Sequence, residues 1–325
     1  MFKKLLAVLP FVLLLAYTNT IGQTKAESFI TNPITSGFYA DPCIVKDGNT
    51  YFIYATTDPW GGNELGVLET KDFKHFKQHH LNWPTKKSCT SPTSQKNMVW
   101  APSVRKALNG KYYMYVAVGS EIWAGVSVTP LGPWKNAKAD NSPLVKYTDF
   151  PQVHNIDADC FIDTDGKAYL YWGSGFGWVN GHCMAVKLKD DMISFDGKAL
   201  DVTPPLYFEA PHMIKRKNKY YLMFSYGKAI DATYKIGYAV SNSPLGPFTK
   251  GKNNPILATS PDSTIYGPGH NTVFTEKGQD YILYHRILPQ RKQYVLRQLC
   301  IDSLNIDKQC NIRKIKSQGV RNFTK

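Results

Sequence analysis

Short apolar stretches alternate with polar turns along the chain, and one such unit returns five times. Each copy begins with a polar or aromatic segment, continues as an apolar strand, turns at Gly, Asn, Asp or Lys, and ends in a tyrosine-rich strand. The copies are ADPCIVKDGNTYFIYA from Ala40, WAPSVRKALNGKYYMYV from Trp100, DADCFIDTDGKAYLYWG from Asp157, EAPHMIKRKNKYYLMFS from Glu209 and GPGHNTVFTEKGQDYILYH from Gly267. Such repeated hairpins are typical of β-propeller blades. The chain is therefore predicted to be an all-β, five-bladed β-propeller.

Further strands are predicted between the repeats. Residues 124–128 and 235–240 are candidates for outer strands, and each is followed by a matching turn, PLGPW or PLGPF. No segment shows sustained helical periodicity with caps. Five blades fill the chain and leave residues 32–39 and the segment after Arg291 to close the ring.

The N-terminal 26 residues have the layout of a secretory signal: Lys3 and Lys4, an apolar run over 5–16, and a polar stretch with small residues. The run is too short to span a bilayer. We expect residues 1–26 to be a signal peptide and residues 27–325 to form one propeller domain, secreted or periplasmic, without a membrane span. A monomer is expected.

Export permits disulfides, and the chain has six cysteines. Cys300 and Cys310 flank a predicted turn and are the favoured pair, whereas Cys43 and Cys160 lie in apolar strands, where free thiols are as well suited as a bridge. No Cys spacing is typical of a metal site.

The formal net charge is +14. The densest basic cluster, Lys215, Arg216, Lys217 and Lys219, falls on a predicted hairpin turn, and a solvated turn is favoured over a nucleic-acid site. We therefore expect no nucleic-acid partner. An acidic polysaccharide or envelope remains an alternative partner for the positive charge.

The first residues of the inner strands suggest the chemistry. Inner strands of a propeller line its axis, so Asp41, Trp100, Asp157, Glu209 and His270 are expected to occupy equivalent positions around one axial pocket. Three neighbouring carboxyl groups raise one another's pKa. Glycosidic cleavage needs such a set, with an ionised carboxylate as base or nucleophile and a protonated one as acid. The alternative is three ordinary solvent-facing carboxylates.

The same segments resemble the signatures of glycoside hydrolase family 43. These are Asn32-Pro33 leading to Ala40-Asp41-Pro42, Trp100-Ala101-Pro102, Ile156-Asp157 with Phe161-Ile162-Asp163-Thr164-Asp165-Gly166, Glu209-Ala210-Pro211-His212, and Gly267-Pro268-Gly269-His270-Asn271. The resemblance covers nearly the whole chain after residue 26. One departure is Ala158, where the family commonly has proline.

The resemblance implies an inverting hydrolase of plant-type polysaccharides that needs no organic cofactor. It assigns Asp41 as general base, Glu209 as general acid, and Asp157 as the residue that tunes the pKa of the acid and orients it. It also implies that His270 supports a hydrated calcium or sodium ion. A core histidine hydrogen-bonded beneath the pocket is an equal alternative for His270.

Five side chains are candidates for substrate binding. Trp100 leads the second repeat, and Trp60 and Trp178, with Phe176 beside the latter, fall in Gly-rich segments after inner strands, where packing between blades is the alternative. Family resemblance suggests that Arg297 contacts substrate, and a surface arginine is the alternative.

The sequence thus predicts an exported hydrolase acting on an oligosaccharide or polysaccharide that contains arabinose or xylose, as an exo-acting α-L-arabinofuranosidase or β-xylosidase. An endo-arabinanase, a galactan-directed hydrolase and a non-catalytic carbohydrate-binding propeller are alternatives. A protein-interaction propeller would instead have an apolar mouth.

Overall fold

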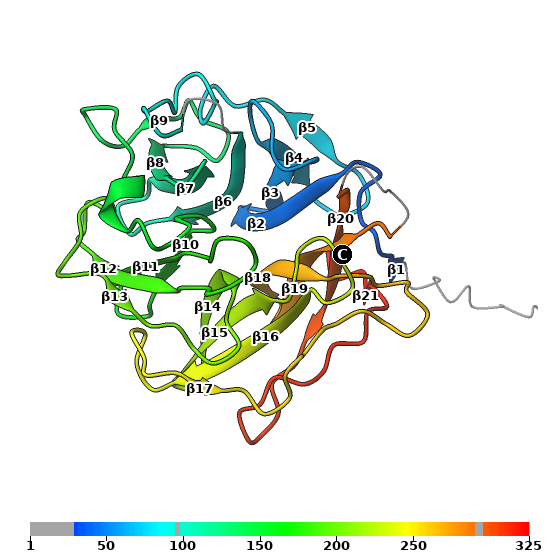
Figure 1. Ribbon diagram of the computed structural model, residues 1–325. Coiled ribbons are helices and arrows are strands. Elements are labelled where there is room, and N and C mark those ends of the chain that lie inside the picture. Colours follow the sequence, from blue (N-terminus) through cyan, green and yellow to red (C-terminus); the bar gives the residue numbers. More distant parts are fainter. Residues whose placement is uncertain (1–28, 95–97, 290–294, 325) are drawn as a thin grey trace, which may run out of the picture.

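The computed structural model describes residues 29–94, 98–289 and 295–324. Five small antiparallel sheets stand in a ring around one axis, in sequence order (Figure 1). The predicted five-bladed β-propeller is confirmed. The predicted signal peptide, residues 1–26, lies outside the described residues.

Each blade is built from consecutive strands, the first innermost. Blade one contains β2 (Tyr39–Asp47), β3 (Thr50–Thr57), β4 (Gly66–Thr70) and β5 (Lys77–His79). Blade two contains β6 (Val99–Lys106), β7 (Tyr112–Val118), β8 (Ile122–Ser127) and β9 (Lys135–Asn136). Blade three contains β10 (Asp159–Ile162), β11 (Ala168–Trp172), β12 (Met184–Leu188) and β13 (Leu200–Asp201).

The last two blades follow the same plan. Blade four contains β14 (Glu209–Arg216), β15 (Lys219–Tyr226), β16 (Lys235–Ser241) and β17 (Thr249–Lys250). Blade five contains β18 (Gly269–Glu276), β19 (Gln279–Ile287) and β20 (Arg297–Leu304). Both predicted outer strands are present, as β8 and β16. The described residues include one 3-10 turn, η1 (Tyr147–Asp149), and no α-helix.

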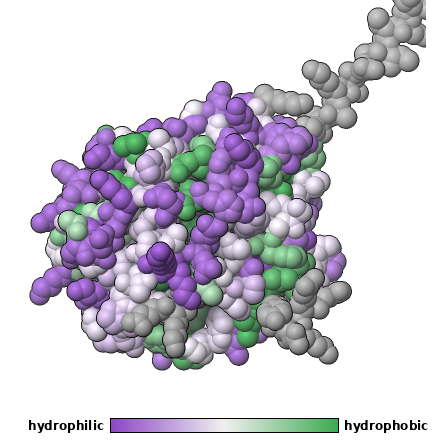
Figure 2. Space-filling view, turned by 90° about the horizontal axis from the view of Figure 1, so that it is seen from above, coloured by the Kyte–Doolittle hydropathy of each residue, from purple (hydrophilic) through white to green (hydrophobic). Residues whose placement is uncertain are grey.

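Five apolar clusters lie between neighbouring blades, one at each of the five junctions. Tyr54 of blade one, for example, shares a cluster with Met114 and Trp123 of blade two. The alternating aromatics of each second strand supply these clusters because one sheet buries neither face until its neighbours stack on it. The surface seen in Figure 2 is mainly hydrophilic, with small separate apolar areas.

The ring closes on the edge of blade five. The N–H of Ile34 donates to the carbonyl of Leu299 at 2.9 Å, and the N–H of Ile301 donates to Oδ1 of Asn32 at 2.7 Å. β1 (Phe29–Ile30) also pairs with β21 (Val320–Arg321). Residues before β2 therefore cover the outer edge of β20, and the prediction that the two chain ends close the ring is confirmed.

The preferred disulfide is wrong. All six cysteines are free thiols, and Cys300 lies buried in the cluster between blades four and five, where Cys310 packs against the same cluster without bonding to it. Cys43 and Cys160 are buried free thiols. None of the helices in the described part of the chain has the length and apolar character needed to cross a bilayer.

The basic cluster of blade four is not simply a solvated turn. Lys215 pairs with Asp163 of blade three at 2.7 Å, and Arg216 pairs with Asp280 of blade five at 2.7 Å. Only Lys217 and Asn218 form the tight turn itself, both with positive φ. Two of the four basic residues therefore bridge blades.

Candidate active site

Four of the five inner strands contain the same β-bulge. In blade one the pairs Ala40–Thr56 and Cys43–Tyr54 leave two residues opposite one, and the same shift follows Trp100, Glu209 and Gly269. Each of these bulges contains one residue with a left-handed backbone, and Asp157 has the same conformation two residues before β10. The five residues are Asp41 (φ 50°), Ala101 (47°), Asp157 (59°), Ala210 (57°) and His270 (43°). Such backbone is uncommon for residues other than glycine and clusters at functional sites.

The bulge corrects the expected equivalence of the five lead residues. Asp41, Asp157 and His270 occupy the left-handed position, whereas Trp100 and Glu209 stand one residue earlier, before Ala101 and Ala210. A bulge turns consecutive side chains differently from a regular strand. Two adjacent positions, rather than one, therefore face the axis.

All five predicted lead residues nevertheless line one pocket, of about 520 Å³, at the axial mouth where the inner strands begin. Trp60, Trp178 and Arg297 line the same pocket, so the structure brings together every site residue predicted from the sequence. Asp41, Asp157 and Glu209 are 5%, 6% and 8% exposed. The alternative of ordinary solvent-facing carboxylates is therefore wrong.

Asp41 is held as a carboxylate by its neighbours. Nη1 of Arg297 lies 3.0 Å from Oδ1, and Nδ1 of His270 lies 3.2 Å from the same oxygen. Thr56 donates its hydroxyl to Oδ2 at 2.7 Å. Burial alone would raise the pKa of Asp41, but the charges of Arg297 and His270 outweigh burial and hold that pKa well below its usual value.

Glu209 is hydrogen-bonded to hydroxyl groups, whereas Asp41 is paired with cations. The Tyr234 hydroxyl lies 2.7 Å from Oε1, and the Ser174 hydroxyl lies 3.2 Å from Oε2. Burial raises the pKa of Glu209; these hydrogen bonds oppose the rise, and the negative charge of Asp41 adds to it. Because its pKa is raised, Glu209 retains its proton at a pH at which Asp41 has already lost its own.

Asp157 titrates together with Glu209. Burial raises the pKa of Asp157 to about 8; the charge of His270 opposes this rise, and Glu209 and Asp41 add to it. Each negative charge disfavours the other, so loss of the first proton from the pair makes the second proton harder to remove. The pair therefore stays partly protonated at neutral pH.

His270 bridges the two aspartates. Its Nδ1 lies 3.2 Å from Oδ1 of Asp41 and 3.9 Å from Oδ2 of Asp157. Burial alone would lower its pKa, but the charges of Asp41 and Asp157 raise the pKa to about 9. At neutral pH the ring is therefore an imidazolium.

This charge does not favour a cation beside the ring. Among the described residues no group of three His, Cys, Asp or Glu side chains is arranged to hold a metal ion. A hydrated ion at His270 stays a prediction from the resemblance, and no chemical step is derived through it.

Arg297 is not a surface side chain. It is 3% exposed, and its Nη2 lies 2.6 Å from Oδ1 of Asp58 while Nη1 reaches Asp41. Trp60 covers the guanidinium, with Cζ 5.0 Å from the indole centroid. Asp58 therefore fixes Arg297, and Arg297 in turn fixes Asp41.

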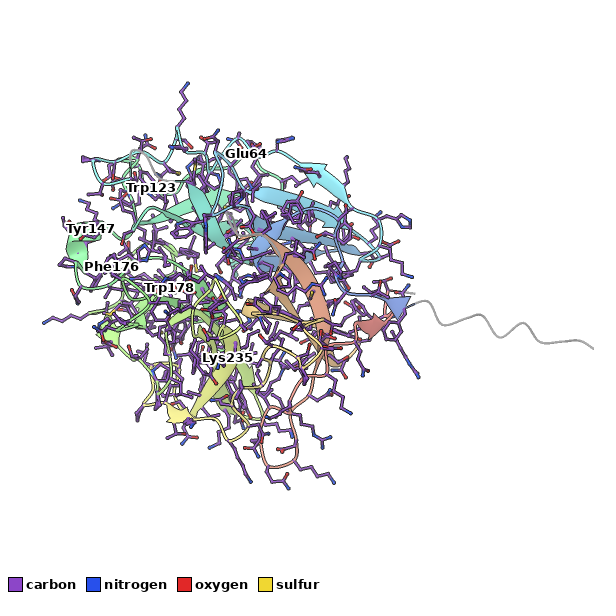
Figure 3. All side chains as sticks on the ribbon, turned by 45° about the vertical axis from the view of Figure 1, so that its right-hand side comes forward. Glu64, Trp123, Tyr147, Phe176, Trp178 and Lys235 are labelled. Atoms are coloured by element: carbon purple, nitrogen blue, oxygen red, sulfur yellow. The ribbon has the colours of Figure 1, made fainter. Side chains whose placement is uncertain are left out.

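The aromatic candidates form the pocket wall. Trp60 and Phe176 are 37% and 45% exposed, so the alternative that they pack between blades is wrong for both. Trp178 contacts Phe208, with ring centroids 5.8 Å apart. Trp100 lies opposite His154 at a centroid separation of 6.0 Å. Figure 3 shows Phe176 and Trp178 close together on the loop that follows β11.

Sequence reasoning missed several residues of this site: Thr56, Asp58, His154, Ser174, Tyr234 and His285. His285 is fully buried and its Nδ1 accepts the N–H of Asp41 at 3.2 Å; burial lowers its pKa to about 4, so the ring is neutral. Only Asp58, three residues into the segment after the first repeat and two residues before Trp60, had a local signal. Ser174 and His285 contact the acids from neighbouring blades, and Thr56 and Tyr234 contact them from other segments of the same blade. His154 lies beside Ser174.

A five-bladed propeller with paired ionised and protonated carboxyl groups in an axial pocket defines a glycosidase-type site. A family model described as "Glycosyl hydrolases family 43" matches residues 30–309. The chain therefore belongs to glycoside hydrolase family 43, whose members hydrolyse O-glycosyl bonds with inversion.

Relatives of known activity agree on the family but differ in substrate. The chain is 34% identical over 319 residues to "Beta-D-galactofuranosidase xynD" of Aspergillus niger, covering 92% of this chain and 90% of the relative. It is 29% identical to "Arabinoxylan arabinofuranohydrolase" of Paenibacillus polymyxa, covering 87% of this chain but only 50% of that protein.

Solved structures share the fold. One described as a thermostable family-43 glycoside hydrolase superimposes with a TM-score of 0.72 at 27% identity, covering 90% of this chain and 97% of its own. An α-L-arabinofuranosidase from Clostridium thermocellum superimposes with a TM-score of 0.68 at 26% identity, covering 89% and 97%.

Proposed function

We propose that the protein is an exported, exo-acting glycosidase that removes single terminal sugars, α-L-arabinofuranosyl residues first among them, from plant glycans. The observation that carries this proposal is the division of protonation states within one pocket. Asp41 is ionised by Arg297 and His270, while burial and like charge keep a proton on the Glu209–Asp157 pair. An inverting glycosidase needs this combination.

Asp41 is the proposed general base. Thr56 accepts the N–H of Ala101 at 2.8 Å, so its own proton is directed to Oδ2 of Asp41. A carboxylate oxygen has two acceptor sites. Oδ2 thus keeps one site for a water, which Asp41 deprotonates as the water attacks the anomeric carbon.

Glu209 is the proposed general acid. It transfers its proton to the departing glycosidic oxygen, while Tyr234 and Ser174 hold its two oxygens in place. Asp157 is the proposed tuning residue: when the pair holds a single proton, an ionised Asp157 favours that proton on Glu209. Its carboxyl group also accepts the backbone N–H of Ala210, the residue after Glu209, and this contact orients the acid. The reaction ends with Asp41 protonated and Glu209 ionised, and solvent restores both.

β-D-Galactofuranosides are the second candidate substrates. The supporting observation is the 34% identical relative of that activity. Ring substituents of α-L-arabinofuranose and β-D-galactofuranose have the same configuration, and the latter has one more carbon in its exocyclic chain. A pocket of about 520 Å³ has room for either sugar.

The test is a panel of 4-nitrophenyl glycosides: α-L-arabinofuranoside, β-D-galactofuranoside, β-D-xylopyranoside and α-L-arabinopyranoside. We expect the highest kcat/KM on one of the two furanosides. A preference for the xylopyranoside would replace the proposed specificity with the β-xylosidase alternative. Absence of turnover on every glycoside, with sugar binding retained, would favour the carbohydrate-binding propeller. Export is proposed from the layout of residues 1–26 and is tested by N-terminal sequencing of the mature protein.

A further inference from the structure

The catalytic pocket adjoins a series of two further hollows over blade two. A hollow of about 470 Å³ shares Trp100, Gly119 and His154 with the pocket. A third hollow, of about 430 Å³, shares Thr93 and Tyr147 with the second. The shared residues place the three hollows one after another, from the axis to the outer part of blade two, and this row of hollows is hereafter the path.

The path leaves the pocket beside the proposed general acid. His154 and Ser174 exchange backbone hydrogen bonds of 3.2 and 2.9 Å, and the Ser174 hydroxyl reaches Oε2 of Glu209 at 3.2 Å. The general acid stands next to the glycosidic oxygen, so the leaving part of a substrate departs on this side.

Aromatic rings stand along the path. The ring centroids of Trp100 and His154 lie 6.0 Å apart, and Phe176 stacks on His154 with a centroid separation of 5.0 Å. Tyr147 of η1 follows between the second and third hollows. In Figure 3, Trp123, Tyr147, Phe176 and Trp178 succeed one another down the same side of the molecule. Sugar C–H faces pack well on such rings.

The path ends at a buried carboxylate. Glu121 is 2% exposed and lines the third hollow, where the Ser91 hydroxyl donates to its two oxygens at 2.7 and 2.8 Å and the Thr93 hydroxyl donates to Oε1. Hydroxyl partners make this end polar, which suits the hydroxyl groups of a sugar. Burial lowers the pKa of His154 to about 4, so its neutral ring also offers one donor and one acceptor.

We propose that these hollows bind the aglycone of the substrate, a neutral oligosaccharide or polysaccharide backbone that runs from Trp100 and His154 past Tyr147 to Glu121. This inference rests on the proposed function. It assigns the cleaved sugar to the axial pocket and at least two further sugar units to blade two. Tyr147 is a specificity-determining residue for the length of the aglycone.

The experiment measures kcat/KM for a 4-nitrophenyl glycoside and for oligosaccharides of increasing length that carry the same terminal sugar. We expect kcat/KM of the wild-type protein to rise with aglycone length. Tyr147→Ala should lower kcat/KM for the longest oligosaccharide by roughly tenfold. The change should appear mainly in KM, because the lost contact stabilises the bound substrate and the transition state equally. The aryl glycoside does not reach Tyr147 and should be turned over as before. Tyr147→Phe keeps the ring and should retain the length dependence.

Leu108→Ala provides a surface control, since Leu108 is 83% exposed in the turn after β6. A wild-type kcat/KM independent of length, or a Tyr147→Ala loss that is equal for aryl glycoside and oligosaccharide, overturns the aglycone path. Failure of the wild-type protein on every aryl glycoside would instead overturn the proposed function. Calorimetry of the oligosaccharides with Glu209→Gln then decides the path separately, because their affinity must still fall with Tyr147→Ala.

Discussion

The two ends of the propeller axis use the same types of side chain in opposite ways. Where the inner strands begin, Asp41, Asp157 and Glu209 share two cations, Arg297 and His270. Beyond this mouth, five further ion pairs each join a carboxylate to a cation of the neighbouring blade. The five pairs are Lys46–Glu276, Lys106–Asp47, Arg105–Asp159, Lys215–Asp163 and Arg216–Asp280.

These five pairs form a ring, because each links one neighbouring pair of blades: five to one, one to two, two to three, three to four and four to five. In this ring, hereafter the ion-pair ring, burial tends to raise the pKa of Asp163, but bonds from Lys215 and Tyr220 outweigh it and the pKa is lowered. At the active mouth burial prevails and raises the pKa of Asp157 to about 8. In the ion-pair ring the partners of Asp163 outweigh burial and stabilise its charged state, whereas burial outweighs the partners of Asp157 and leaves a proton available for chemistry.

The largest expected effect is a difference in kcat between variants at the active mouth and a variant in the ion-pair ring. Asp41→Asn and Glu209→Gln should each lower kcat by at least about a hundredfold, the lower range for losing a general base or acid, with folding preserved. Asp163→Asn, in the ion-pair ring, should leave kcat unchanged. Initial rates and circular dichroism of all three proteins check this. Turnover equal to wild type in either mouth variant would exclude that residue from the mechanism.

The next effect tests how Arg297 keeps Asp41 ionised. Arg297→Lys retains the positive charge but loses the planar fork that reaches both Asp41 and Asp58, so we expect kcat/KM to fall by roughly tenfold. The pKa of Asp41 should rise toward its usual value. Because the base must be ionised, the acid limb of the pH–rate profile should move to higher pH.

A pH–rate profile of kcat/KM measures this shift directly. Arg216→Lys is the matched control, since it makes the same exchange within the ion-pair ring and should leave both limbs in place. A loss of activity in Arg297→Lys without movement of the acid limb would show that Arg297 acts on substrate or structure instead of on the pKa of Asp41.

A smaller effect tests the coupling between Asp157 and Glu209. Asp157→Asn removes the second acid of the pair, whose ionised form keeps the last shared proton on Glu209, so the pKa of Glu209 should fall. Activity is lost as pH rises through the pKa of the general acid, so the alkaline limb should shift to lower pH. Aryl glycosides with acidic phenols need little proton donation and should lose less activity than oligosaccharides.

Rates measured across pH for aryl glycosides and for oligosaccharides test this prediction. An alkaline limb that stays in place, together with equal losses on both substrate types, would mean that Asp157 acts through binding or structure.

The smallest effect concerns stability alone. Asp163→Asn should lower the Tm at neutral pH by about 2–4 °C without changing kcat, because one link between blades three and four is weakened. The pKa of Asp163 is lowered in the folded protein, so its contribution is complete above the ordinary aspartate pKa and disappears as pH falls through the folded value. The Tm difference from wild type should therefore shrink in acid. Thermal unfolding at pH 7 and pH 3 measures it, and an equal difference at both pH values would contradict an ionic origin.

The sequence by itself determined the strands, the turns and the order of the blades. Alternating aromatics after turns such as Asp165-Gly166 encode hairpins through interactions between near neighbours. The same repeats placed Asp41, Asp157 and Glu209 at the starts of inner strands, and the family signatures agreed with that placement. Local pattern was sufficient for both results because each depends on a few consecutive residues.

Only the tertiary structure decided the protonation states and the partners of these acids. Arg297 lies 256 positions from Asp41 in the sequence, and Tyr234 reaches Glu209 from the connection before β16, so neither contact has a local signal. The β-bulge moved Glu209 one position from the expected equivalence, which two-residue periodicity does not reveal. Burial, shared cations and the ion-pair ring arise from the meeting of different blades. They exist only once the ring is closed.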